Sequence, residues 1–485
     1  MAPSHRTVDL CSRDNKSALI SFENTGWTAL LHHLDGTRSS RGRVALCSKF
    51  KLSSAIIHLF ASNSPSFTRF GVPGLKTVGV SVLLLASASL LSCGSYSRPS
   101  TSNTTGAKLR AFITNPLAPA GVVTTPIIDV VDALKDKLVG AIAIPASQPG
   151  FMVVFPNKRF SLVYGAGNNS ITKIENATES VNGSALTLAG PTESIVVAPD
   201  NVTGYAAVPT AAVNGQDQGV VEVLNLASNT VTATIPVPGA HFVAVSHNGS
   251  RVLVFGVQTS TFSGLALITP SLIGTSQNPV LDFPPNPSAF DHPVAGIFSS
   301  DDNTAFILNC GAECGGTAAS VTPLDMNANA LGNPVSVNAA TVGMLAGSTL
   351  YVAGTPPSCL PGTIAPDCGT LSVIDTSLMA VTNQNLIFIT DGYHNHLEMG
   401  ADGQLFVGAR TCSAGCLSIF DTTGSGKVTF PTDTGDVTGI QPITARHVVY
   451  VCENGELRIY DTTTDKLQAT QIDIVGQAVD VRLVD

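Results

Sequence analysis

Residues 219–256 decide the fold of this chain, and they read GVVEVLNLASNTVTATIPVPGAHFVAVSHNGSRVLVFG. The stretch holds four short runs rich in β-branched and other apolar residues: Val220–Leu224, Val231–Pro236, Phe242–Val245 and Arg251–Phe255. Turn-forming residues separate the runs, and none of them keeps a helical spacing of apolar residues over ten positions. The stretch therefore predicts four consecutive β-strands, which in isolation would leave two apolar faces uncovered.

The same unit repeats along the chain from about residue 106. Aligned on the strand that follows the Pro/Gly turn, the units are spaced by about 41 to 55 residues, close to the spacing of propeller blades. The expected innermost strands are Phe151–Phe155, Ser194–Ala198, Phe242–Val245, Val294–Phe298, Thr341–Leu345, His396–Gly400, Val437–Ile440 and Ala478–Leu483. A second strand follows each of the first seven, as Arg251–Phe255 does in the opening stretch.

The third strand of several units ends on Asp before a Thr turn, as in LSVIDTS (Asp375), LSIFDTT (Asp421) and LRIYDTT (Asp461). Together with residues 219–256, these units resemble the YVTN-type repeat of bacterial surface β-propellers. The resemblance covers roughly residues 106–485 and implies four-stranded blades arranged radially around a channel. We therefore expect an all-β propeller of eight blades, or of seven if one of the degenerate units is an insertion.

The two ends of the repeat region complement each other. The chain ends on a lone inner strand, Ala478–Asp485, whereas Arg110–Asn115, Pro126–Asp132 and Leu138–Pro145 supply three strands without an inner one. A blade built from both ends closes the ring and leaves no open sheet edge. We expect the propeller to span residues 108–485.

The N-terminal region has the features of a leader. Residues 1–92 carry 10 Lys and Arg and 4 Asp and Glu, and a charged segment precedes the apolar run from Val78 to Leu91. Leu90-Leu91-Ser92-Cys93 then resembles the bacterial lipoprotein signal, in which the cysteine is lipidated and becomes the first residue of the mature protein. The apolar run is too short for the ~20 residues of a spanning helix. We interpret residues 1–92 as a leader and signal peptide, of which 1–70 reflect an over-extended start, and residues 93–107 as a lipidated flexible tether.

Composition narrows the function classes. The chain has 25 Lys and Arg and 34 Asp and Glu in all, so residues 93–485 carry 15 basic and 30 acidic side chains. An acidic body repels phosphate backbones, which argues against nucleic-acid binding. The GxSxG, HExxH, Walker A and dinucleotide-binding glycine patterns are all missing from the sequence.

Six cysteines form three close pairs, each between the second and third strand of successive units: Cys310 and Cys314, Cys359 and Cys368, and Cys412 and Cys416. An exported compartment permits disulfides, so we expect each pair to staple its own loop on one face of the propeller. The alternative is a metal site with four cysteine ligands. Cys452 occupies the equivalent place without a partner, which predicts a free thiol or an intermolecular one.

Four histidines, His241, His292, His394 and His396, lie in the links that lead from one blade to the next inner strand. Such links meet around the mouth of a propeller channel, with Asp291, Asp391 and Glu398 close by in sequence. Imidazoles that converge there could bind Cu or Zn or act as acid–base groups. We expect, however, that these are loop histidines satisfied by backbone carbonyls or water, with no cofactor, and keep Cu or Zn binding as the alternative.

The sequence thus favours a lipid-anchored binding module of the bacterial cell envelope, in the outer membrane if one is present. It would present its loops or channel mouth to a protein, peptide or envelope polymer. A metal-dependent enzyme that uses the four histidines is the alternative, and a structural surface-layer component is a second one.

Overall fold

The structure is a computed structural model that describes residues 104–485 except 121, 122, 287 and 384. The leader, the expected signal sequence and Cys93 lie outside the described residues. Within the part of the chain that is described, no helix is long and apolar enough to cross a membrane.

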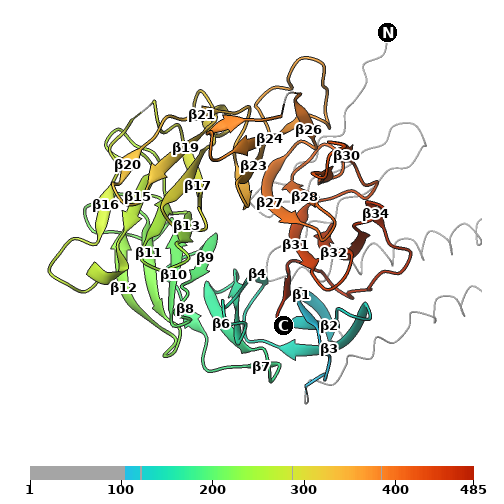
Figure 1. The fold of residues 1–485 in the computed structure, drawn as a ribbon. Coiled ribbons are helices and arrows are strands. Elements are labelled where there is room, and N and C mark those ends of the chain that lie inside the picture. Colours follow the sequence, from blue (N-terminus) through green and yellow to red (C-terminus); the bar gives the residue numbers. More distant parts are fainter. Residues whose placement is uncertain (1–103, 121–122, 287, 384) are drawn as a thin grey trace, which may run out of the picture. The chain divides into compact units, whose positions relative to one another are not determined.

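Eight antiparallel sheets surround a central axis and form an eight-bladed β-propeller (Figure 1). The predicted fold class is therefore confirmed, with eight blades rather than seven. The inner strands are β4 (Pro149–Val154), β9 (Ser194–Val197), β13 (Phe242–Val245), β17 (Pro293–Phe298), β22 (Val342–Ala346), β27 (Tyr393–Met399), β31 (Val437–Ile443) and β35 (Val481–Leu483). Each overlaps one of the strands expected from the repeat.

Three further positions complete each blade. The second strands are β5 (Phe160–Gly165), β10 (Thr203–Val208), β14 (Val252–Phe255), β18 (Thr304–Asn309), β23 (Thr349–Gly354), β28 (Gln404–Arg410), β32 (Val448–Glu453) and β1 (Arg110–Ala120). The third strands are β6 (Ser170–Glu175), β11 (Val220–Asn225), β15 (Leu265–Ile268), β19 (Ser320–Asp325), β24 (Gly369–Asp375), β29 (Leu417–Asp421), β33 (Glu456–Asp461) and β2 (Val123–Asp132).

Most outer strands are only two or three residues long, although β12 and β3 each have seven, and in three blades two pieces share the outer edge. They are β7 (Ser180–Val181) with β8 (Leu186–Thr187), β12 (Thr230–Pro236), β16 (Val280–Asp282), β20 (Ala330–Leu331) with β21 (Val335–Ser336), β25 (Ala380–Val381) with β26 (Ile387–Ile389), β30 (Val428–Thr429), β34 (Lys466–Leu467) and β3 (Lys137–Ala143). Two short 3-10 helices, η1 (Pro270–Leu272) and η2 (Gly311–Cys314), lie in loops. Short outer strands limit the sheet edge that is open to pairing with other chains.

The Asp that ends the third strand shapes the turn to the outer strand. The Asp375 carboxylate accepts hydrogen bonds from the backbone N–H of Ser377 at 2.8 Å and of Leu378 at 3.2 Å. Asp461 accepts the equivalent bonds from Thr463 and Thr464. Aspartate satisfies the backbone of a tight turn in this way, so the repeat keeps Asp at this position for local structure rather than for chemistry.

The ring closes where β35 pairs with β1 and completes the sheet β3-β2-β1-β35. The register places Phe112 opposite Arg482. The Arg110 backbone N–H and guanidinium both donate to the Asp485 carboxylate, and the Val484 N–H donates to the Arg110 carbonyl at 3.0 Å. The C-terminus consequently lies beside β1 and β2 (Figure 1), as the complementary ends of the repeat region predict.

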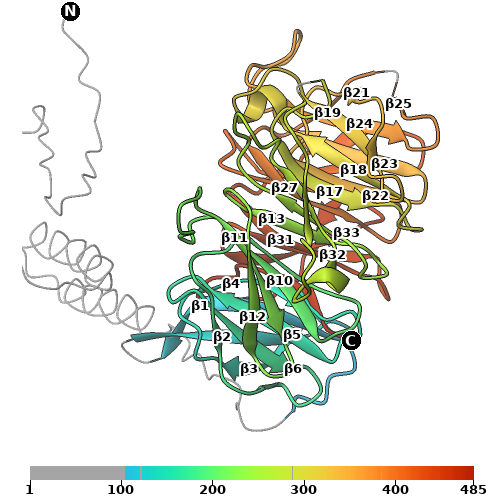
Figure 2. The ribbon, with the colours of Figure 1, turned by 90° about the vertical axis from the view of Figure 1, so that its left-hand side faces the viewer.

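The hydrophobic core lies between the blades rather than inside one of them. Buried residues form eight larger clusters, and each cluster joins two neighbouring blades. The cluster around Phe112 joins β1 and β2 of the closing blade to Met152 and Val163 of the next blade, which lie beside it in Figure 2. Every sheet therefore depends on both of its neighbours for burial.

A cavity in the core beside the closing blade should lower the free energy of unfolding. Phe112 is fully buried, so Phe112→Ala removes a packed ring at the interface that closes the propeller. We expect the free energy of unfolding to fall by about 3–5 kcal/mol, measured by urea denaturation. Leu134→Ala, at a side chain that is 46% exposed, is the control and should change stability by less than about 0.5 kcal/mol. Equal losses in the two variants would contradict this account of closure.

Candidate functional site

Three disulfides staple neighbouring loops on one face of the ring. They are Cys310–Cys314 between β18 and β19, Cys359–Cys368 between β23 and β24, and Cys412–Cys416 between β28 and β29. All three predicted pairs are present, and no four-cysteine cluster is formed by the described residues. Because every loop joins a second strand to a third strand, all three project from the face at which the inner strands begin. We call this surface the loop face.

Cys452, in contrast, has no disulfide partner among the described residues. It lies in β32 with its side chain fully buried, and burial raises the pKa of its thiol well above the usual value. A buried, protonated thiol is unreactive and out of reach of another chain. Of the two expectations for this residue, the free thiol is the one that the structure shows.

Acidic residues of the blade links hold the stapled loops in place. The Asp291 carboxylate accepts hydrogen bonds from the Thr317 N–H at 2.7 Å, the Thr317 hydroxyl at 2.6 Å and the Ala318 N–H at 2.8 Å. Partial burial favours the neutral carboxyl, but these bonds outweigh it and hold the pKa of Asp291 well below its usual range. Asp391 binds the N–H and hydroxyl of Ser413 in the same way. Both carboxylates are thus occupied in positioning loops of their own blades.

The four histidines proposed as metal ligands lie in different surroundings and contact different groups. The His241 Nδ1 lies 3.2 Å from the Gly239 carbonyl oxygen, and the His292 Nδ1 lies 3.0 Å from an Asp291 oxygen. His394 and His396 both lie on β27, separated by a β-bulge. The described residues contain no group of three or more His, Cys, Asp or Glu side chains placed to hold a metal. The structure does not gather the four histidines into one site, so Cu or Zn binding stays a prediction.

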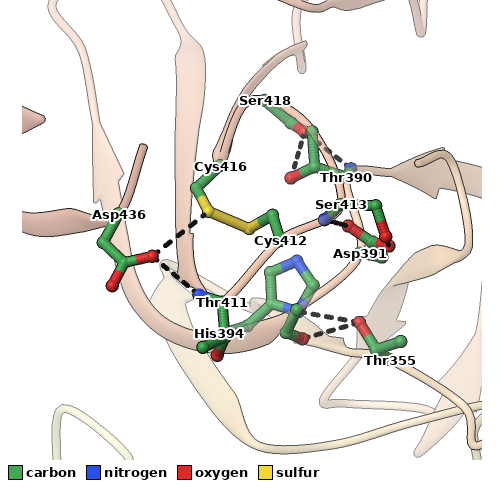
Figure 3. The surroundings of a disulfide bond; sticks show 11 residues. Thr355, Thr390, Asp391, His394, Thr411, Cys412, Ser413, Cys416, Ser418 and Asp436 are labelled. Carbon is green, nitrogen blue, oxygen red and sulfur yellow. Dashed lines mark hydrogen bonds between the residues drawn. A yellow bond between two sulfur atoms is a disulfide. The ribbon is translucent and has the colours of Figure 1, made fainter. Parts of the chain in front are cut away.

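His394 is enclosed beneath the third stapled loop. Its side chain is fully buried, and its Nδ1 lies 3.4 Å from the Thr355 hydroxyl, beside the Cys412–Cys416 disulfide (Figure 3). A side chain at Gly369 would crowd it, since an added Cβ would lie 2.8 Å from the His394 Cε1. Burial lowers the pKa of His394 to about 4, despite opposing effects of the Thr390 backbone and Asp391. The imidazole is therefore neutral at physiological pH.

The strand β27 concentrates buried polar atoms that lack a hydrogen-bond partner among the described residues. They are the His394 Nε2, the Asn395 Oδ1 and the His396 Nε2, three residues in succession. Burial, with smaller contributions from Arg482 and Arg410, lowers the pKa of His396 to about 3. Unsatisfied buried polar atoms are rare in folded proteins and point to water or to a ligand. Among the described inner strands, β27 alone carries such atoms.

Charged side chains and histidines are unevenly distributed among the inner strands. Among the inner strands, Asp, Glu, Lys, Arg and His side chains occur only on β27 (His394, His396 and Glu398) and on β35 (Arg482). The strand between them, β31, adds Thr438 and Gln441. We call the three neighbouring inner strands β27, β31 and β35 the polar arc. Sequence reasoning missed Arg482, although a lone charge in an inner strand of Val and Leu is a signal that could have revealed it.

Burial also shifts the pKa of one carboxyl group on the loop face, that of Glu313. Glu313, in the loop closed by Cys310–Cys314, reaches the next blade and accepts a hydrogen bond from the Thr355 N–H at 2.9 Å. Burial raises the pKa of Glu313 to about 7, and this bond only partly opposes the effect. The first stapled loop is thus linked to the segment that carries the second disulfide by a carboxyl group whose pKa is about 7.

Comparison with known proteins identifies the architecture only. No family model matches the chain, and no curated protein matches it. Among solved structures, the chain is similar to the dihydro-heme d1 dehydrogenase NirN in complex with DHE, with a TM-score of 0.55, 12% identity, and coverage of 80% of this chain and 77% of that one. It is also similar to the hydrazine synthase of Kuenenia stuttgartiensis, with a TM-score of 0.50, 14% identity, and coverage of 66% and 97%. At this identity, both likenesses support the β-propeller fold alone.

The Glu313 carboxyl gives a pH dependence with a defined sign. Its pKa in the folded protein is raised above the usual value of 4.5, so the folded state holds its proton more tightly than the unfolded state does. The contribution to stability is complete below pH 4.5 and is lost as the pH rises through about 7. Glu313→Gln retains an oxygen acceptor for Thr355 and does not titrate. Urea denaturation at pH 5 and pH 8 should show a smaller loss of stability in the variant than in the wild type, and parallel losses would disprove the assignment.

Proposed function

We propose that this chain is a binding module of the cell envelope that holds a protein, peptide or envelope polymer on its loop face. The observation that carries the proposal is the set of three stapled loops on successive blades. A disulfide restricts the conformations of a loop, so a stapled loop loses less conformational entropy when it binds a partner. Three such loops side by side provide a broad, rigid surface.

The loops are stapled and yet exposed, which fits a binding surface better than a purely structural one. Ile364, in the loop closed by Cys359–Cys368, is 81% exposed. Ser413 and Ala414 are exposed in the loop closed by Cys412–Cys416, as are Thr317 and Ala318 beside the first staple. Exposed loop residues on a rigid frame are where proteins commonly carry their binding groups.

Site-specific photo-crosslinking in intact cells tests the loop face. A photoreactive residue at Ile364 or Ala414 should give a discrete adduct with a second molecule. The same residue at Ser250, in the exposed turn between β13 and β14 on the opposite face, should give none. Adducts from Ser250 alone would place binding elsewhere. Adducts with twice the mass of the chain would replace the proposal with self-association in a surface layer.

We further propose that the protein is exported and attached to the membrane by lipid on Cys93. The support is the leader sequence, together with three disulfides, which persist in oxidising compartments. The body then lies outside the cytoplasm, within reach of envelope components.

Metabolic labelling with a fatty-acid analogue tests the anchor. The wild-type protein should incorporate the label and partition with membranes, whereas Cys93→Ala should lose the label and remain in the unprocessed, higher-mass form. Cys452→Ala is a matched control and should be labelled as the wild type is. Label that persists in Cys93→Ala would overturn the proposed anchor without affecting the proposal for the loop face.

A further inference from the structure

A cavity of about 450 Å³ lies beside the inner strands on the face away from the stapled loops. Its position follows from its lining, because it includes the turn at which β4 ends and the chain reverses into β5. The lining residues are Met152, Val153, Val154, Phe155, Pro156, Lys158, Gln441, Arg482 and Leu483. The cavity thus combines one apolar wall, from β4 and its turn, with Gln441 and Arg482 of the polar arc on its other side.

Arg482 brings a positive charge to this cavity with part of its guanidinium unused. Its Nε donates to the Asp480 carboxylate at 3.3 Å, and its side chain remains 25% exposed. Neither Nη atom of Arg482 has a hydrogen-bond partner among the described residues. A guanidinium fork with free N–H groups in a partly desolvated place suits bidentate binding of a carboxylate or a phosphate.

The neighbouring carboxylate of Asp480 is fixed by backbone hydrogen bonds and does not occupy the Nη groups of Arg482. Asp480 is almost fully buried, and its carboxylate accepts hydrogen bonds from the Met152 N–H at 2.6 Å and the Val481 N–H at 2.8 Å. The close packing of this group depends on Gly439, where an added Cβ would lie 2.7 Å from the Asp480 Oδ1. Asp480 therefore positions Arg482 through its Nε and leaves the Nη groups available.

Lys158, the second cationic residue of the lining, is already engaged in a hydrogen bond within the protein. The Lys158 ammonium donates to the main-chain oxygen of Asp485, the C-terminal residue. Glu398, on β27, interacts electrostatically with Arg482, yet the two are not in ion-pair contact. An incoming anion would thus be attracted by Arg482 and repelled by two carboxylates, that of Asp480, which is paired with Arg482, and that of Glu398.

From the lining and the free Nη groups of Arg482, we infer that this cavity binds a small organic anion, a carboxylate or phosphate joined to an apolar group. The anionic group binds the Arg482 guanidinium, and the apolar group packs against the half-buried side chains of Val153 and Val154. This site is separate from the loop face and does not depend on the function proposed for that face.

Calorimetric titration of the purified full-length protein tests the inference, with hexanoate and hexyl phosphate as probes and 1-hexanol as the uncharged control. We expect at least one anion to bind with 1:1 stoichiometry and at least ten-fold more tightly than hexanol, and the stronger anion identifies the head group. Arg482→Gln should weaken that binding at least ten-fold, whereas Lys158→Gln should change it less than three-fold.

Two further variants separate binding from folding. Glu398→Gln removes one of the two opposing carboxylates and should tighten anion binding several-fold, a gain that misfolding cannot produce. Val154→Phe should fill the apolar wall and weaken binding while Arg482 is kept. Binding of neither anion to the wild type, equal binding of hexanol, or undiminished binding to Arg482→Gln would overturn the inference.

Discussion

Every sheet of this protein has two apolar faces, and neither face can be covered from within its own blade. The eight hydrophobic clusters each join two blades, so the burial that stabilises one sheet is supplied by the next. A linear array would leave the first and last faces in water. The pairing of β35 with β1 removes that penalty, and the rest of the ring depends on it.

Closure also determines where function can reside. Because the faces of the sheets are buried between neighbouring blades, only the loops at the two ends of the ring and the edges of the inner strands remain available for recognition. The protein uses these places differently. On one face, disulfides and the carboxylates of Asp291 and Asp391 fix the loops. Along the channel, apolar inner strands give way to polar ones at β27, β31 and β35.

The polar arc lies next to the seam of the ring. Arg482 belongs to the last strand, and its partner Asp480 accepts a hydrogen bond from Met152 at the start of the ring. The charged group in the channel is consequently built by the same contacts that close the propeller. Ligand binding there would stabilise the closed ring, since an open ring lacks the complete cavity and cannot bind the ligand as well.

The sequence by itself determined the repeat, the eight inner strands, the exchange of strands between the two ends and the three disulfide pairs. These features rest on local patterns, namely alternating apolar runs, Asp-Thr turns such as that at Asp375, and cysteines only a few residues apart. Which histidines meet, and which charge faces the channel, was decided only by the tertiary structure. His241 and His292 bind their own links, and Arg482 stands near Glu398 although 84 positions separate them. The physical reason is that strand patterns encode which residues are buried, whereas the distance between side chains of different blades is set by the number of blades and the register at closure.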